Sequence, residues 1–190
     1  MRRTLASLSM IAALLASATP GRAADYTIDP THSHILFTID HLGFAKIVGL
    51  FSDFSGSISF DANSASSSKL NVTIKTDSLQ TQFAPRDKDL KGADWFNSTE
   101  FPEITYVGTE FVKKDDHTGT VTGKLTLHGV TKPVSFVLVG GRKAEFPKGV
   151  HRTGYSAELS IKRADFGMDK MADAIGDDVR ISISVEGTKK

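Results

Sequence analysis

Three histidines near the start of the chain raise the question of a metal site. His32 and His34 would share one face of an extended strand, and His41 follows shortly after. Zinc requires three or four converging nitrogen, sulfur or carboxylate ligands. The chain has no cysteine, and no glutamate lies near enough in sequence to complete a set with these histidines. We therefore predict no metal centre here, and we expect the three histidines to occupy a turn, the surface and the wall of an interior.

Carboxylates and serines are the next candidates for chemistry. Asp165, Asp169, Asp173 and Asp177 recur every fourth residue, a spacing that would line up carboxylates along a helix. A calcium loop needs oxygen ligands at alternate positions and a closing glutamate, and that pattern is absent. No G-x-S-x-G nucleophile elbow occurs either. We predict no catalytic residues, and an enzyme is the least favoured alternative.

Aromatic and aliphatic residues are concentrated in one stretch, residues 31–60. Ile35, Phe37 and Ile39 alternate along it, which is typical of a strand with one buried face. Phe51 and Phe54 break that alternation because they are three residues apart. A bulge or bend at Ser52 and Asp53 would return both rings to the same face.

The rest of the chain is predicted to consist mostly of short strands. Further strands are expected at 25–28, 70–76, 103–112, 120–127, 132–139, 155–162 and 179–185. Loops are expected at 61–68 and 140–149, a loop or short helix at 165–178, and a short amphipathic helix at 85–94 that begins with Pro85. About eight strands joined by hairpin turns indicate an all-β sandwich or barrel. The up-and-down order favours an antiparallel barrel, because closure removes exposed strand edges.

The first 23 residues are predicted to be a cleaved signal peptide. Arg2 and Arg3 precede an apolar run, and small residues follow, with cleavage expected before Ala24. The apolar run is too short to span a bilayer, and the residues after the arginine pair match a twin-arginine signal poorly. We therefore predict an exported protein whose barrel domain comprises residues 24–190.

The charge of the remaining chain argues against nucleic acid as a partner. Removing Arg2, Arg3 and Arg22 with the leader leaves 20 basic residues against 22 acidic ones, a net charge of −2. The lysines and arginines are scattered among acidic residues instead of forming a patch. The absence of cysteine excludes disulfides, thiol catalysis and covalent haem attachment. Folding must therefore rely on packing alone.

Several segments, taken together and in order, resemble the YceI-like family of exported lipid-binding proteins. The resemblance extends over essentially the whole chain after the leader, and its most distinctive part is GKLTLHGVTKP at 123–133. The other segments that carry it are 26–29, 32–33, Phe37, 41–43, Gly49, Phe51, Gly56, 86–87, 90–91, Phe96, 101–102, Arg163 and 165–167.

The resemblance implies an extended, eight-stranded, lipocalin-like barrel with one or two short helices and a long apolar pore. The family's ligand would be a polyisoprenoid or a similar single-chain amphiphile, an isoprenoid quinone or a fatty-acyl lipid included, and no cofactor is required. Members are typically periplasmic or secreted, with no catalytic apparatus generally attributed to them. Some look like partners of membrane cytochrome b561-type proteins.

We therefore predict a periplasmic or secreted binding or carrier protein for a long-chain amphiphile, without stable membrane insertion. We expect His41, Arg86 and Arg163 to contact the head group. The alternative is a structural or stress-response interaction protein with a filled core, and the sequence leaves open whether the protein forms a homodimer. The residues expected to line the pore are Phe37, Ile39, Phe51, Phe54, Ile58, Phe60, Ile74, Phe96, Leu125, Leu127, Phe136, Ile161 and Phe166.

Overall fold

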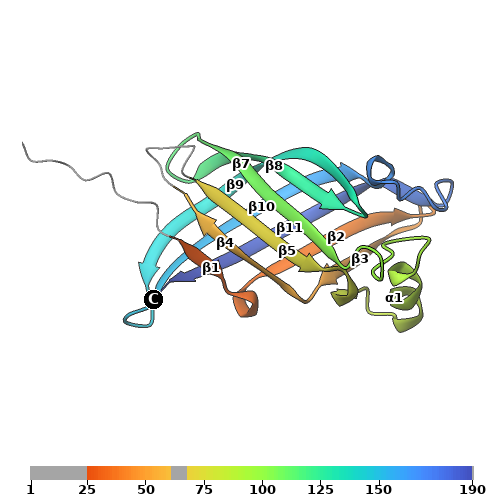
Figure 1. Cartoon of the computed structure of the whole chain (residues 1–190), viewed down its shortest axis with the longest axis horizontal. Helices are drawn as coiled ribbons and strands as arrows, with labels where there is room; N and C mark the ends of the chain where they lie inside the picture. Colours follow the sequence, from red (N-terminus) through yellow and green to blue (C-terminus); the bar gives the residue numbers. More distant parts are fainter. Residues whose placement is uncertain (1–24, 61–67, 190) are drawn as a thin grey trace, which may run out of the picture.

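The computed structural model describes residues 25–60 and 68–189. The predicted signal peptide, residues 1–23, lies outside this part of the chain, as does most of the predicted loop at 61–68. Within it the chain is an antiparallel β-barrel with one short α-helix, which confirms the predicted fold class (Figure 1).

The strands follow one another along the chain with short connections. In order they are β1 (Tyr26–Ile28), β2 (His34–His41), β3 (Ala45–Phe51), β4 (Phe54–Ser59), β5 (Lys69–Lys75), β6 (Leu79–Gln80), β7 (Glu103–Lys113), β8 (Thr118–Leu127), β9 (Val130–Glu145), β10 (His151–Lys162) and β11 (Ile175–Lys189). The helix α1 (Ala84–Lys91) lies between β6 and β7, and 3-10 turns in the described residues occupy Pro30–His32, Thr76–Ser78 and Arg163–Phe166.

These strands form eight positions around the barrel, which we call staves. The strands β1 and β2 both pair with β11, so they form a single stave interrupted at Pro30–His32. On their other side β1 pairs with β4 and β2 pairs with β3, which makes β3 and β4 the second stave. The strands β5 and β6 form the third in the same way. Because β11 pairs with both β10 and β1, the sheet closes on itself.

The second stave bends between Phe51 and Phe54, as predicted. Phe51 pairs with Leu79 and Phe54 pairs with Ile74, and the two residues between them leave the ladder. Ser52 and Asp53 are both exposed, so this interruption turns both phenylalanine rings inward. Both rings are buried, with 7% and 5% of their surface accessible.

Several predicted boundaries were wrong. The strand β10 begins at His151, four residues before its predicted start at 155. The predicted loop at 140–149 is largely strand, because β9 continues to Glu145 and pairs with β10. Gly140 and Gly141 have φ of +132° and +88° at a register shift in this ladder, so they form a bulge and not a turn. The strand β11 begins at Ile175, four residues before its predicted start at 179.

Inward-facing apolar side chains from all staves form one hydrophobic cluster. Close packing requires small residues opposite large rings. A Cβ atom on Gly49 would lie 2.1 Å from Cζ of Phe37, its partner across the β2–β3 ladder. Such contacts fix the ring of Phe37 against the sheet. No helix in the described ranges is both long and apolar enough to cross a membrane.

Candidate ligand-binding cavity

The interior of the barrel is not filled. A cavity of about 870 Å³ runs between the staves, and side chains from all eight of them line it. This volume is near the upper end of the range for small-molecule pockets, roughly 300–1,000 Å³. Nearly all of the strand residues that line it are aliphatic or aromatic. The cavity can therefore accommodate a large apolar group.

Eleven of the thirteen residues predicted to line the pore do line this cavity. Phe54 and Phe166 do not line it, and contact of any of the thirteen with a ligand stays a prediction. Both belong to the packed hydrophobic core, with 5% and 2% of their surface accessible. The eleven that line the cavity are Phe37, Ile39, Phe51, Ile58, Phe60, Ile74, Phe96, Leu125, Leu127, Phe136 and Ile161.

Aromatic rings form a continuous part of the cavity wall. Phe51 contacts Phe37 on β2 and Phe96 in the segment after α1, with ring centroids 5.8 Å apart in both pairs. Further along the barrel, Phe60 packs edge-on against Tyr155, with 5.2 Å between centroids. The chain after α1 thus becomes part of the wall through Phe96.

Several residues that line the cavity were not predicted, although their pattern is visible in the sequence. On β11, Val179, Ile181, Ile183 and Val185 alternate with polar residues and all line the cavity. That strand was predicted from this alternation, but none of its residues was assigned to the pore. Trp95 also lines the cavity, and no periodic pattern marks it because it lies outside any strand.

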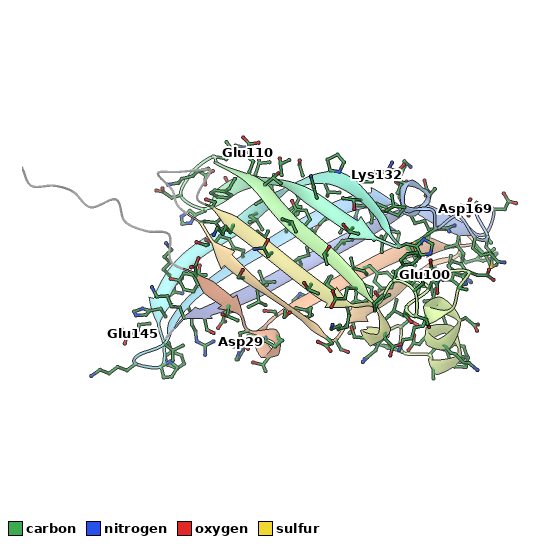
Figure 2. All side chains as sticks on the ribbon, viewed as in Figure 1. Asp29, Glu100, Glu110, Lys132, Glu145 and Asp169 are labelled. Atoms are coloured by element: carbon green, nitrogen blue, oxygen red, sulfur yellow. The ribbon has the colours of Figure 1, made fainter. Side chains whose placement is uncertain are left out.

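The cavity opens at the end of the barrel where α1 lies. Every exposed residue that lines it comes from this end, whereas the strand residues that line it are buried or half-buried. The labelled Glu100 and Asp169 lie at the same end, and Asp29 and Glu145 lie toward the other (Figure 2). The exposed lining residues are Phe83, Pro85, Lys88, Asp89, Gly92, Ala93, Asp94 and Met171.

Arg163 is the most deeply buried charged residue at this end, with 4% of its surface accessible. Its Nε donates to the carbonyl oxygen of Gly176 at 2.9 Å, and Nη2 donates to Ile175 O at 2.9 Å. Its Nη1 donates to the carbonyls of Met168 and Lys170. Among the described residues no carboxylate lies within ion-pair distance of it. The guanidinium therefore holds residues 167–176 in place, which comprise the loop before β11 and the first two residues of that strand. It lines the cavity at the same time.

The other two predicted head-group residues lie at this end as well. His41 ends β2, is half-buried and lines the cavity. Arg86 on α1 also lines it, and its Nε and Nη2 donate to Oγ1 and O of Thr81 at 2.7 and 2.6 Å. The fold therefore brings His41, Arg86 and Arg163 to one end of the cavity. Their contact with a head group stays a prediction.

Comparison with known proteins identifies the family. The YceI-like domain matches residues 26–187. The chain belongs to the YceI-like family. Protein YceI of Shigella flexneri is 41% identical over 194 residues, and the match covers the whole of both chains. A crystal structure of the Campylobacter jejuni YceI protein superimposes with a TM-score of 0.71 at 33% identity, covering 80% of this chain and 90% of that one.

A more distant structure shares the fold. It is a polyisoprenoid-binding domain from Saccharophagus degradans, implicated in plant cell wall breakdown. It superimposes with a TM-score of 0.69 at 19% identity, covering 87% of this chain and 98% of that one. The YceI-like barrel is therefore retained at low sequence identity.

Two tyrosines inside this YceI-like barrel have a raised pKa. Burial raises the pKa of Tyr106 to about 12, and it also raises the pKa of Tyr155. The Tyr106 hydroxyl donates to Val134 O at 3.0 Å, so it is satisfied within the wall. A general acid or base works best with a pKa near the operating pH, and these phenols are shifted away from it.

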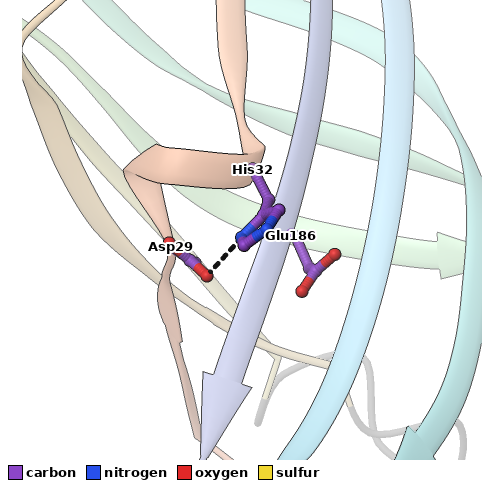
Figure 3. A group of neighbouring side chains, drawn as sticks. All are labelled: Asp29, His32 and Glu186. Carbon is purple, nitrogen blue, oxygen red and sulfur yellow. Dashed lines mark hydrogen bonds and ion pairs between the residues drawn. The ribbon is translucent and has the colours of Figure 1, made fainter. Parts of the chain in front are cut away.

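His32 lies far from the cavity opening, in a polar cluster that the sequence did not predict (Figure 3). Its Nδ1 lies 2.8 Å from Oδ2 of Asp29, and Glu186 approaches them from β11. Arg152 on β10 pairs with the carboxylates of both Asp29 and Glu186. Because the guanidinium of Arg152 pairs with both carboxylates, the cluster connects the residue after β1 with β10 and β11. Neither His34 nor His41 belongs to it.

Proposed function

We propose that this protein binds or carries one long-chain amphiphile, with the chain along the barrel cavity and the head group at the α1 end. The class comprises isoprenoid lipids, isoprenoid quinones and fatty-acyl lipids. The observation that carries this proposal is the cavity of about 870 Å³, lined by apolar strand residues and opening at one end. We further propose, from the leader-like residues 1–23, that the protein acts in the periplasm.

The distribution of polarity supports this orientation of the ligand. Burying an apolar chain is favourable by about 25 cal/mol per Å², so a long chain needs few polar contacts. Polar lining groups other than the two tyrosines gather at the opening, where Arg86, Lys88 and Arg163 could contact a polar or anionic head group. If the apolar chain of the ligand lies inside the cavity and its head group at the opening, none of these polar groups faces hydrocarbon.

Two alternatives are less well supported. A ligand-free protein with a filled core does not account for a cavity of this size. An enzyme acting on a lipid or quinone gains no support from the cavity tyrosines, because burial moves the pKa of Tyr106 and of Tyr155 away from neutrality and so weakens them as general acids or bases. Contact with a membrane cytochrome b561-type partner and homodimerisation are compatible with a carrier, and both stay proposals.

The test is organic extraction of freshly purified full chain followed by mass spectrometry. We expect one class of long-chain amphiphile, at close to one molecule per barrel. Recovery of no lipid from folded protein, together with failure of delipidated protein to take up isoprenoid or acyl chains, would overturn the proposal.

A pair of variants connects that result to the cavity. Leu159→Trp adds bulk to a residue that lines the cavity, and Ser160→Trp adds the same bulk to the exposed neighbour on β10. We expect the first variant to lose most of its lipid and the second to retain it, because only the first reduces the cavity. Equal lipid content in two folded variants would place the ligand elsewhere.

A further inference from the structure

We propose that the end of the barrel around the cavity opening docks onto the surface of a zwitterionic phospholipid bilayer. This inference rests on the proposed function, because the proposed ligand is a long-chain amphiphile and such molecules reside in membranes. It adds a surface around the cavity opening, and this surface can be tested independently through Phe44, which does not line the cavity.

The observation is a set of exposed apolar side chains on the segments around the opening. Phe44 is 88% exposed and Leu42 is 51% exposed, both in the turn between β2 and β3. Phe83, just before α1, and Met171, in the loop before β11, are 55% and 53% exposed. We call these four residues the apolar rim. Each exposes apolar surface to water at a substantial cost, which contact with lipid would remove.

The three segments of the apolar rim are joined at this end of the molecule. The backbone N–H of Leu42 donates to Ala174 O at 2.8 Å, and that of Ala174 donates to Met171 O at 3.0 Å. Phe83 and Met171 both line the cavity opening. Figure 1 shows α1, the β2–β3 turn and the loop before β11 at the same end of the barrel. The rim thus surrounds the passage through which a ligand would move.

Exposed apolar residues elsewhere have a different character. Most are valines on the outer face of strands, where β-branched residues are common. Phe146 is the exception: it is 73% exposed and directly follows β9, at the opposite end of the barrel from α1. It therefore provides a matched control. The valines are Val48, Val107, Val112, Val137 and Val139.

The charges around the rim favour a zwitterionic surface over an anionic one. Segment 83–94 carries three basic and three acidic residues, and segment 167–178 carries one basic and four acidic ones. Lys170, the one basic residue of the second segment, pairs with Asp94 at 3.2 Å. No excess of positive charge is left to attract anionic lipid. Apolar contact is therefore the attraction we assign to this face.

The test is co-sedimentation of the protein with phosphatidylcholine vesicles. We expect the unaltered protein and Phe146→Ser to partition equally, and Phe44→Ser to partition about tenfold more weakly, from the loss of a large exposed ring. Adding phosphatidylglycerol should not strengthen binding. Absence of vesicle binding, binding that requires phosphatidylglycerol, or equal binding by Phe44→Ser and Phe146→Ser would each overturn the proposal.

A second measurement distinguishes docking on a membrane from association of two copies of this protein. If the apolar rim were a dimer contact, Phe44→Ser would change the sedimentation coefficient and leave vesicle binding unaltered, and docking would be wrong. Phe44 does not line the cavity, so its exchange should not alter lipid content in mass spectrometry. Phe44-dependent vesicle binding without any bound lipid would refute the proposed function alone. Bound lipid with Phe44-independent vesicle binding would refute docking alone.

Discussion

The two ends of the barrel are built in different ways. At the end with α1, strands give way to a helix, a 3-10 turn and the 167–176 loop, and exposed residues line the cavity there. At the other end the β10–β11 ladder is regular as far as His151 and Lys189, and the β9–β10 ladder continues past its bulge to Glu145. A cluster of paired charges around Arg152 braces that end.

This difference indicates how a closed barrel admits a ligand. Strand ladders satisfy every backbone group locally and leave no room for an opening. At the α1 end the loop before β11 and the first two residues of that strand precede the regular part of its ladder with β2, and the buried guanidinium of Arg163 donates to four of their carbonyl oxygens. At this end, hydrogen bonds from one side chain therefore take the place of strand pairing.

The largest expected effect follows from removing Arg163. Arg163→Met leaves the carbonyls of the 167–176 loop without their donor, and we expect the free energy of unfolding to fall by about 3 kcal/mol. Urea unfolding measures this. Arg180→Met, on the exposed face of β11, is the matched control and should change stability by less than about 0.5 kcal/mol. Equal effects of the two would mean that Arg163 does not organise this end.

A smaller effect is expected in the wall between the two ends. Gly49→Ala would force the ring of Phe37 to move, at a cost of about 1–3 kcal/mol. Combining it with Phe37→Leu should recover part of this loss, because the smaller side chain leaves room. Gly154→Ala is the control, since the nearest atom to its Cβ lies at 3.7 Å, and its urea midpoint should barely change. No recovery in the double variant would refute the packing argument.

The smallest effect concerns the braced end and depends on pH. Hydrogen bonds from Thr31, then from His32, lower the pKa of Asp29 from 3.8 to about 2. A carboxyl whose pKa is lower in the folded protein than in the unfolded chain stabilises the fold at any pH above its unfolded-chain pKa. This stabilisation is lost as the pH falls through the pKa of the folded protein. Asp29→Asn should therefore be less stable than the unaltered protein near pH 7, and most of that difference should be lost by pH 2. A difference at pH 2 as large as that at pH 7 would contradict this assignment.

Alternation of apolar and polar residues predicted the strands of the barrel well, but it did not predict the residues around the cavity opening. Period-2 alternation reveals strands such as β8 and β10 because one face of each is buried, and the excess residues between Phe51 and Phe54 revealed the bend. The paired Gly140 and Gly141 were interpreted as a loop because a bulge and a turn require the same backbone freedom. The place of Trp95 in the cavity wall and the carbonyl oxygens that accept hydrogen bonds from Arg163 could not be predicted. Both depend on contacts between segments far apart in the sequence.

The most direct test of the central claim uses Trp95, the chain's one tryptophan, which lies in the cavity wall near Arg163. Delipidated protein would be titrated with two long-chain amphiphiles, one brominated next to the head group and one brominated at the chain end. We predict saturable quenching of Trp95 by both, and stronger quenching by the first, because the head group stays at the α1 end. Stronger quenching by the second would reverse the orientation, and no saturable quenching by either would refute the binding site.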